Sequence, residues 1–312
     1  MAQNPSPGAP PRLTSPDKLI FPDARFTKRD LADYLDAVAD AFLPQLRDRP
    51  VTRVRFPDGV AGERLFQRHV GRGAPGWVRT ARLRASPVDM GREASSDPGS
   101  SALVVSPVVD DRRTLAWMAN QATVEFHTPQ WRLGPRGAVR PPDRLVIDLD
   151  PGEGAGLDEC ARAARLVRTA LAADGLAPVP VTSGGKGLHV RCALLPDEGG
   201  PRGRLPFART AIGVHRYVRE LAHRLAEEEP GLIVARAAKE DRVGRVFLDW
   251  SQNHPAKSTI TPYSLRAKGP RPTVAAPRTW EEIRPGLAQL GPDQVLARLQ
   301  RDGDLLAAPS TP

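Results

Sequence analysis

The sequence predicts an α/β (α+β) protein in which helices cover one face of an open β-sheet. Residues 144–250 alternate as strand, helix, strand, strand, helix and strand, a βαββαβ-like order. The strand segments are apolar, the helical segments are amphipathic, and Gly- and Pro-rich turns separate them. With 312 residues, 40% of them hydrophobic, the chain can form one large domain or two coupled ones around a real core.

The first 140 residues predict a mixed part that precedes this sheet. Residues 1–14 are expected to be a disordered leader, and a short strand-like run lies within 17–28. A helix follows, with Thr27 or Asp30 near its start, and Pro44 and Pro50 are expected to close that region. Further expected elements are strands within 51–70, the loop 85–101, the strand LVVSPVV, a helix at 114–122 and the loop 134–144.

From residue 144 the expected elements are better separated by turns. The predicted strands and helices are 144–150, 157–173, 179–182, 188–194, 206–228 and 244–250. A Pro-rich stretch follows, and helices are expected at 280–290 and 292–301. No internal repeat or heptad pattern occurs, which excludes solenoid and coiled-coil architectures.

The composition excludes several classes of protein. No run of 18 apolar residues occurs, so we expect no transmembrane helix and no membrane partner. The N-terminus lacks a secretory signal pattern. Cys160 and Cys192 have no Cys or His neighbours at ligand spacing, which argues against a disulfide scaffold and a structural zinc site. These features predict a cytoplasmic, nucleoid-associated protein, and the lack of an apolar surface stripe predicts a monomer.

The charge balance favours a phosphate-rich partner. Lys and Arg number 45 against 36 Asp and Glu, a net charge of +9. A basic surface raises both the encounter rate with nucleic acid and the non-specific affinity for it. An arginine-rich composition inherited from a GC-rich genome would give the same balance, so charge alone leaves both interpretations open.

The first candidate site is the strand RLVIDLDPG. Alternation puts Asp148 and Asp150 on the same face of the strand, and two carboxylates so close repel each other. A divalent cation removes that repulsion, and oxygen ligands suit Mg²⁺ or Mn²⁺. Two solvated aspartates at a strand end are the alternative.

The second candidate site is the segment VTSGGKGLHV. Its glycines and Ser183 let backbone N–H groups approach a phosphate, Lys186 adds a positive charge, and His189 can reach the same place. The segment lacks the Gly-Lys-Ser/Thr ending of a P-loop and the spacing of a dinucleotide fingerprint. An ordinary Gly-rich hairpin with a structural histidine is the alternative.

The third candidate site is the segment GRVFLDWSQN. Asp249 ends an apolar strand there, as Asp148 and Asp150 do, and neighbouring strands would bring the three carboxylates together. Such a triad supports two-metal phosphoryl transfer, and Lys257 and Arg266 downstream suit phosphate oxygens. For Asp249 alone, a strand-end cap is the alternative.

These motifs together resemble one known family. VIDLDPGEG, TSGGKGLHV, and FLDWSQN followed by KSTITPYSLR are similar to the polymerase domain of bacterial DNA ligase D, a member of the archaeo-eukaryotic primase superfamily. The resemblance runs from about Ser15 through Leu306 and includes LTSPDKLIFPD, RPVTRVRFPDGV and EFHTPQW. It implies a primase-polymerase fold with a mostly antiparallel, RRM-like core at 141–270. The other parts would be an N-terminal DNA-end-binding part at 15–140, a C-terminal helical segment at 271–306 and a tail at 307–312.

The resemblance also implies roles for individual residues. Asp148, Asp150 and Asp249 would bind two catalytic Mn²⁺ or Mg²⁺ ions. The expected nucleotide-binding residues are Ser183, Lys186, His189, Gln252, Lys257, Arg266 and His127. Lys18 and Lys28 would bind the 5′-phosphate at a DNA gap or break. Where relatives often have two phenylalanines that stack on template bases, this chain has Leu65 and Phe66, so template positioning is expected to be looser.

The expected function is therefore a nucleotidyltransferase of non-homologous end joining. It would fill gaps and extend 3′ ends with NTPs or dNTPs, with Ku and an ATP-dependent DNA ligase as possible partners. Whether the segment acts alone or as part of a larger ligase stays open. The alternatives are a primase that starts chains de novo, a non-catalytic DNA-end-binding module and, less compatible with the few histidines, a metal phosphoesterase.

Overall fold

A six-stranded sheet forms the centre of one half of the protein. The computed structural model describes residues 11–71, 73–84, 103–194 and 205–307. The strand order is β11-β12-β8-β10-β9-β16, antiparallel except for the β11–β12 pair. The strands are β8 (Arg144–Pro151), β9 (Pro178–Thr182), β10 (Leu188–Ala193), β11 (Ile233–Val234), β12 (Val246–Asp249) and β16 (Ala276–Pro277). The mostly antiparallel sheet is confirmed; β11 and β16 were not predicted.

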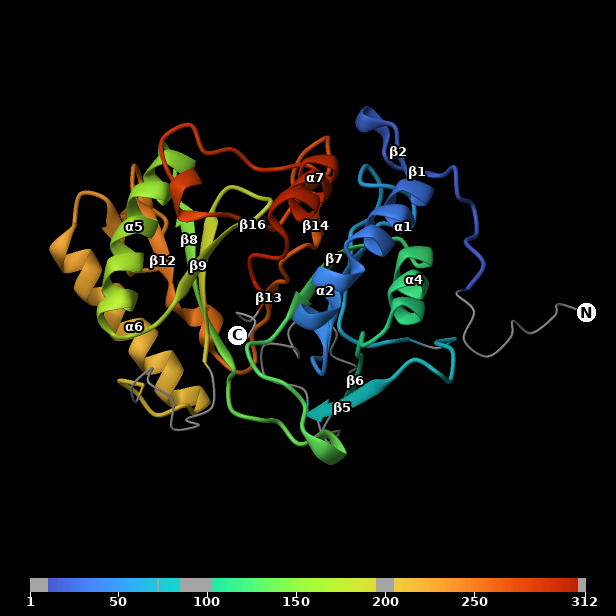
Figure 1. Cartoon of the computed structure of the whole chain (residues 1–312), viewed down its shortest axis with the longest axis horizontal. Helices are drawn as coiled ribbons and strands as arrows, with labels where there is room; N and C mark the ends of the chain where they lie inside the picture. The colour runs from blue at the N-terminus through green and yellow to red at the C-terminus, as the bar shows by residue number, and fades with distance from the viewer. Residues whose placement is uncertain (1–10, 72, 85–102, 195–204, 308–312) are drawn as a thin grey trace, which may run out of the picture.

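Two helices, α5 (Leu157–Ala173) and α6 (Ala211–Glu228), cover one face of this sheet, as predicted (Figure 1). Leu145, Ile147 and Leu149 of β8 point into the core that these helices share with the sheet. Alternation then directs Asp148 and Asp150 to the opposite face. Helix α6 starts five residues later than predicted, because the side chain of Thr210 accepts from Gly213 N at 3.0 Å and caps the helix there.

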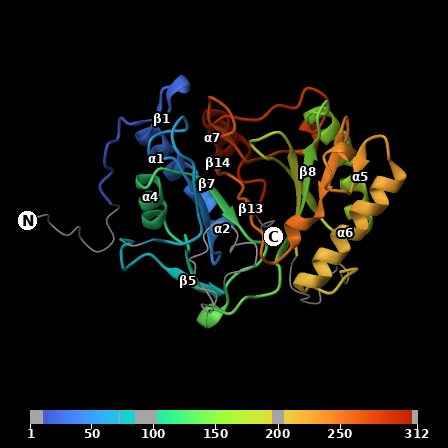
Figure 2. The same cartoon turned by 180° about the vertical axis from the view of Figure 1, so that it is seen from behind.

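A four-stranded sheet of order β13-β7-β3-β4 forms the centre of the other half. Its strands are β3 (Thr52–Arg55), β4 (Leu65–Gln67), β7 (Thr123–Thr128) and β13 (Thr259–Ile260). Its outer face packs on α1 (Lys28–Ala37), α2 (Ala39–Leu46) and α4 (Arg112–Asn120). These three helices and the pair α5 and α6 thus lie on the outer sides of the two halves, and the sheets face inward (Figures 1 and 2).

The N-terminal helix differs from its prediction. Thr27 and Asp30 form a capping box at its start, as expected, but the chain divides at Val38 into α1 and α2. Pro44 lies inside α2 instead of closing the region. Burial of Phe42 against Phe126, with ring centroids 5.3 Å apart, helps to hold this turn of helix despite the hydrogen bond that Pro44 removes.

Shorter elements complete the chain. They are the pairs β1 (Leu19–Phe21) with β2 (Phe26–Thr27), β5 (Thr80–Arg84) with β6 (Leu103–Pro107) and β14 (Leu265–Arg266) with β15 (Thr273–Val274), helix α7 (Pro292–Asp302), and the 3-10 turns η1 (Pro22–Ala24), η2 (Pro135–Gly137), η3 (Glu240–Arg242), η4 (Trp250–Asn253) and η5 (Trp280–Glu282). The predicted helix 280–290 is wrong: only η5 forms there, because Pro285 and Gly286, at φ +84°, end it.

The ends of the chain and one loop were also predicted from sequence. Of the leader predicted as disordered, residues 11–14 lie against α4, and Thr14 Oγ1 donates to Asn120 Oδ1 at 2.9 Å. The loop 85–101 lies outside the described residues, as do residues 1–10 and 308–312. In the part of the chain that the structure covers, no helix has the length and apolarity to cross a membrane.

The two halves are joined across the predicted boundary at residue 140. Strand β13 comes from the predicted catalytic core but pairs with β7 of the other half. The buried guanidinium of Arg144 donates to Thr128 Oγ1 at 2.7 Å and to Gln130 Oε1 at 2.9 Å. Because a buried arginine needs such partners, these bonds fix the start of β8 against the end of β7.

The glycine that opens β10 gives the first testable prediction. A Cβ at Gly187 would lie 2.1 Å from the carbonyl oxygen of Leu149 in β8, so no side chain fits without moving backbone. Gly187→Ala should lower the free energy of unfolding in urea by about 1–3 kcal/mol. Gly231→Ala, in an exposed turn with open space around the new methyl, should change it by less than about 0.5 kcal/mol. Equal stability of both variants would contradict this account.

Candidate active site

Three carboxylates and a histidine lie in a row across adjacent strands. Asp249 of β12 pairs with Asp148 of β8, and His189 of β10 pairs with Asp148 from the other side. Because cross-strand partners share a face, all three side chains leave the inner face of the sheet together. Asp150 follows two residues after Asp148 on the same face. The sequence predicted this convergence if the strands were neighbours, and they are.

Asp148 is the central member of the row. Its Oδ1 lies 3.3 Å from His189 Nε2, and His189 is 3% exposed. Burial alone would raise the pKa of Asp148. His189 and the cations Arg266 and Lys257 outweigh that effect, so the pKa lies below its ordinary value. His189 Nδ1 is buried and has no hydrogen-bond partner among the described residues, which leaves it available to a bound group.

The pKa of Asp150 is shifted in the opposite direction, above its ordinary value. Burial raises its pKa and the charge of Asp148 raises it further, while Arg242 and Lys186 offset part of the rise. Arg242 Nη1 lies 3.2 Å from Asp150 Oδ2. Asp150 is thus an anion beside another anion, and an additional positive charge would stabilise it.

Asp249 is held by the turn η4 that follows it. Its Oδ1 accepts from Ser251 N at 3.0 Å and from Ser251 Oγ, and its Oδ2 accepts from Gln252 Nε2 at 2.8 Å. Lys257 Nζ donates to the same Ser251 hydroxyl. Gln252 and Lys257 were both predicted to contact a nucleotide. In the structure, Gln252 contacts Asp249 directly, and Lys257 is linked to it through Ser251.

The donor set fits a hard divalent cation, but the side chains are not arranged as ligands. Within the described ranges, no group of three Asp, Glu, His or Cys side chains is close enough to hold a metal ion. Asp150 is turned to Arg242, and Asp249 to Ser251 and Gln252. Carboxylate oxygens are the ligands that Mg²⁺ and Mn²⁺ prefer. To bind an ion together with Asp148, Asp150 would have to leave Arg242, and Asp249 would have to leave Ser251 and Gln252.

The Gly-rich segment lies beside the row. Ser183 is buried, and its Oγ accepts from Gly185 N at 3.2 Å, while Lys186 is exposed and acts electrostatically on Asp150. Gly184 has φ +69°, and a Cβ there would lie 2.6 Å from Arg266 Cγ. The glycine therefore permits both the turn and the close approach of Arg266. The structure thus brings four of the predicted nucleotide-binding residues together beside the carboxylates: Ser183, Lys186, His189 and Arg266.

A buried glutamate that the sequence reading missed holds two predicted residues. Glu125 is 1% exposed; its Oε2 lies 3.0 Å from His127 Nε2, and its Oε1 lies 3.5 Å from Arg266 Nε. Burial alone would raise the pKa of Glu125, but the His127 hydrogen bond and the Arg266 charge lower it to about 2. Burial also lowers the pKa of His127, so at neutral pH the ring is neutral and donates its Nε2–H to Glu125. Alternation on β7 puts Glu125 and His127 on one face, which is the signal that could have identified Glu125.

Lys18 and Lys28 lie apart from this site, and Lys28 contacts Asn120 of α4. Lys28 is 5% exposed, and its three donors are taken by Thr14 O at 2.7 Å, Thr14 Oγ1 at 3.1 Å and Asn120 Oδ1 at 2.9 Å. Lys18 Nζ contacts exposed Asp58 at 3.1 Å. Burial lowers the pKa of Lys28, and the charge of Lys18 lowers it further. A phosphate at Lys28 would have to replace one of the existing acceptors, and it would relieve the repulsion between the lysines.

Leu65 and Phe66 point to opposite faces of β4, since they are adjacent in a strand. The Phe66 ring lies on the inner face, 6.5 Å from the His127 ring. Leu65 pairs with Arg55 on the face toward the helices. The two side chains therefore cannot stack on the same base, and Phe66 is the one beside the predicted nucleotide residues.

Comparisons with known proteins identify the family of the chain. The family model of the LigD primase-polymerase domain matches residues 27–306. The chain is 41% identical over 297 residues to the multifunctional non-homologous end joining protein LigD of Mycolicibacterium smegmatis, covering 95% of this chain and 35% of that protein. It is 30% identical over 294 residues to the bifunctional non-homologous end joining protein LigD of Bacillus subtilis, covering 94% of this chain and 43% of that protein.

The fold comparison is equally extensive. A structure of the polymerase domain from Mycobacterium tuberculosis ligase D in complex with DNA superposes with a TM-score of 0.82 at 40% identity. The match covers 95% of this chain and 96% of that one. The chain thus spans about a third of the length of its mycobacterial full-length relatives and nearly all of the solved polymerase domain. The family expected from the sequence motifs is confirmed.

The buried glutamate gives a prediction about stability and pH. A carboxyl whose folded pKa is about 2, against an ordinary 4.5, contributes stability above pH 4.5 and loses it as the pH falls toward 2. Glu125→Gln should therefore lower the free energy of unfolding at pH 7 by on the order of 3 kcal/mol. The difference from the wild type should shrink between pH 4.5 and pH 2. Exposed Glu220→Gln is the control, and a pH-independent difference for Glu125→Gln would refute the charged state.

The carboxylate row gives a prediction about metal binding. Mn²⁺ at 100 times its dissociation constant should stabilise the wild type by about 2.7 kcal/mol, seen as a higher melting temperature. The Asp148→Asn/Asp150→Asn variant should lose this gain, because its remaining ligands are too few. Metal-free Asp150→Asn should be at least as stable as the wild type, since the substitution removes repulsion from Asp148. Exposed Asp33→Asn should respond to Mn²⁺ as the wild type does; an equal response of the double variant would place the metal elsewhere.

Proposed function

The chain belongs to the LigD primase-polymerase family of nucleotidyltransferases, and from that premise we propose that it fills gaps and extends 3′ ends at DNA double-strand breaks. The observation that carries the proposal is the row of Asp249, Asp148 and His189 across three adjacent strands, with Asp150 beside it. A row of carboxylates surrounded by cations suits the transfer of a highly charged phosphoryl group.

The carboxylates would hold the catalytic ions. Asp148, Asp150 and Asp249 supply oxygen ligands for two Mn²⁺ or Mg²⁺ ions. When bound, such ions lower the pKa of an attacking 3′-hydroxyl and stabilise charge on the transferring phosphoryl group. The chain's own contribution is to fix the backbone of the three carboxylates on adjacent strands, while Asp150 and Asp249 would have to release their present partners to bind the ions.

The residues on the β9–β10 side of the row would hold the nucleoside triphosphate, as NTP or dNTP. Lys186 and the guanidinium of Arg266 offer donors to its phosphate oxygens beside the Ser183–Gly187 turn, where the Gly184 and Gly185 N–H groups already donate to Gln289 Oε1 and Ser183 Oγ. The buried carboxylate of Glu125 contacts both Arg266 and His127 and holds them in position. His189 lies where it can donate to a phosphate that approaches Asp148.

The DNA would be an end or a gap that carries a 5′-phosphate. Lys18 and Lys28 act on each other electrostatically, and a terminal phosphate carries more charge than a backbone phosphate, so it gains most from paired cations. Phe66 would stack on a template base at the inner face. Ku and an ATP-dependent DNA ligase are the proposed protein partners, by analogy with the relatives, which are non-homologous end joining proteins.

The test is primer extension on a gapped duplex with a downstream 5′-phosphate, using NTPs or dNTPs with Mn²⁺ or Mg²⁺. We expect metal-dependent extension that falls by about 10³-fold or more in Asp148→Ala/Asp150→Ala. Lys18→Ala/Lys28→Ala should lose the preference for a 5′-phosphate while retaining extension of a primer without one.

Two results would contradict the proposal. DNA binding without extension under any metal and nucleotide condition would indicate a non-catalytic end-binding module. Chain initiation on a single-stranded template without a primer would indicate a primase. Asp33→Ala, on an exposed face of α1, is the matched control for loss of a carboxylate.

A further inference from the structure

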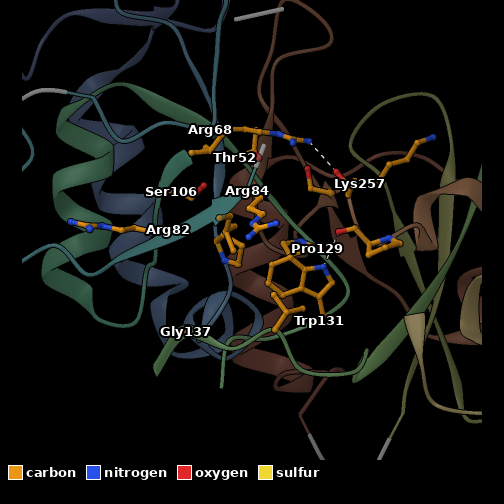
Figure 3. A pocket seen from close by; sticks show the side chains of 16 residues that line it. Thr52, Arg68, Arg82, Arg84, Ser106, Pro129, Trp131, Gly137 and Lys257 are labelled. Atoms are coloured by element: carbon orange, nitrogen blue, oxygen red, sulfur yellow. Dashed lines mark hydrogen bonds between the residues drawn. The ribbon is translucent and has the colours of Figure 1, made fainter. Parts of the chain in front are cut away.

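A pocket of about 490 Å³ lies beside the candidate active site and has no role in the function proposed so far. It is formed where the paired strands β5 and β6 meet the segments that follow β7 and η4 (Figure 3). Arg68 crosses one side of it and donates to Ala256 O at 3.2 Å, which ties the segment after β4 to the segment that contains Lys257.

The pocket is basic. Sixteen described residues line it, and none of these sixteen is Asp or Glu. Four of them are cationic: Arg68, Arg82, Arg84 and Lys257. Figure 3 shows the guanidinium of Arg84 on the Trp131 side of β5, whereas that of Arg82 points the other way. A lining with cations and without carboxylates is complementary to a polyanion.

The rest of the lining is largely apolar. Trp131, Pro129 and Val139 contribute to it, and Trp131 donates its indole N–H to Pro255 O at 2.8 Å. Because that polar atom is already satisfied, the ring presents apolar surface to the pocket. Cations beside apolar and aromatic surface are what a nucleic-acid strand needs, since its phosphates and its sugar and base faces alternate along the chain.

The position of the pocket relative to the carboxylates indicates which DNA strand would bind there. The Ser183–Gly187 turn and Arg266 lie toward β10 and β9, on one flank of Asp148. Lys257 lies on the other flank, because it contacts Ser251, which holds Asp249 of β12. In phosphoryl transfer the attacking and leaving oxygens lie roughly in line. With the leaving pyrophosphate at the turn, the attacking 3′-hydroxyl must arrive from the flank of Lys257, which also lines the pocket.

We propose that this pocket binds the primer strand, in the nucleotides just upstream of the 3′-hydroxyl that is extended. The inference rests on the proposed function, because the positions of the attacking and leaving oxygens in that reaction decide on which flank the primer lies. Arg84 and Lys257 contact backbone phosphates, and Trp131, Pro129 and Val139 contact sugars and bases. The pocket thereby holds a primer end whose pairing with template is short, as at a broken end.

Cross-linking identifies the strand. The photoreactive base 4-thiothymidine is placed two, three or four nucleotides from the primer 3′ end, or at the opposing template positions, of the gapped duplex. After irradiation with the wild-type protein and Mn²⁺, mass spectrometry locates the attached peptide. We expect peptides that contain Trp131 or Val139 from the primer. Attachment of these peptides only to the template strand would overturn the proposal.

Kinetics with variants measures the contribution of the pocket. Arg84→Glu should raise the KM for primer about 10-fold and lower its salt dependence, as expected for a phosphate-contacting cation. Val139→Trp, which fills the pocket from a position that is 55% exposed, should also raise the KM for primer. The KM for nucleotide should change less than twofold in both. Arg216→Glu, an equal change of charge on the exposed face of α6, should leave both constants unchanged.

The outcomes separate this inference from the function on which it rests. If the wild type extends primers and Arg84→Glu and Val139→Trp do so with unchanged primer KM, the pocket assignment is wrong and the polymerase remains. If the KM for nucleotide rises instead, the pocket belongs to the incoming nucleotide, and the assignment is also wrong. If the wild type does not extend primers under any condition, the proposed function itself fails.

Discussion

The register of β8 between β10 and β12 is the constraint on which the site depends. It places Asp148 opposite both Asp249 and His189, and it sends Asp150 to the same face. The other face of β8 is apolar and buried under α5 and α6, so a shift by one residue would bury the carboxylates in the core. The core thus fixes the register, and the register forces like charges together at the inner face.

Cationic and hydrogen-bonding side chains surround this row of carboxylates. Arg242 contacts Asp150, and the turn after β12 supplies Ser251 and Gln252 to Asp249. The other half of the protein contributes Arg266, held by the buried Glu125. Arg144 and β13 join the halves, so the cations and the carboxylates face each other at fixed positions and need not be brought together by closure.

Much of this could be predicted from the sequence because it follows from short-range rules. Period-two alternation and apolar runs gave β8, β10 and β12, and the Thr27 to Asp30 capping box marked the start of α1. The strands β13 and β16 have two residues each and exist only through their long-range partners, so no local pattern reveals them. The partners of Lys28 and Asp150 are likewise set by tertiary packing, as is the contact of Glu125 with Arg266, whereas Asp249 bonds to residues of the turn that follows it.

Under the proposed function, the distribution of charge would make the metal and the phosphates of the substrates bind cooperatively. In the structure, Arg242 is engaged by Asp150, and Lys257 is linked through Ser251 to Asp249. A cation that takes over these carboxylates leaves Arg242 and Lys257 able to contact phosphates. Because linkage is reciprocal, phosphates that engage those side chains must equally favour the cation. The net charge of +9 is therefore not simply a uniform basic surface for DNA. Some of the cationic side chains neutralise the row of carboxylates, and they become available to a polyanion when a metal ion neutralises that row instead.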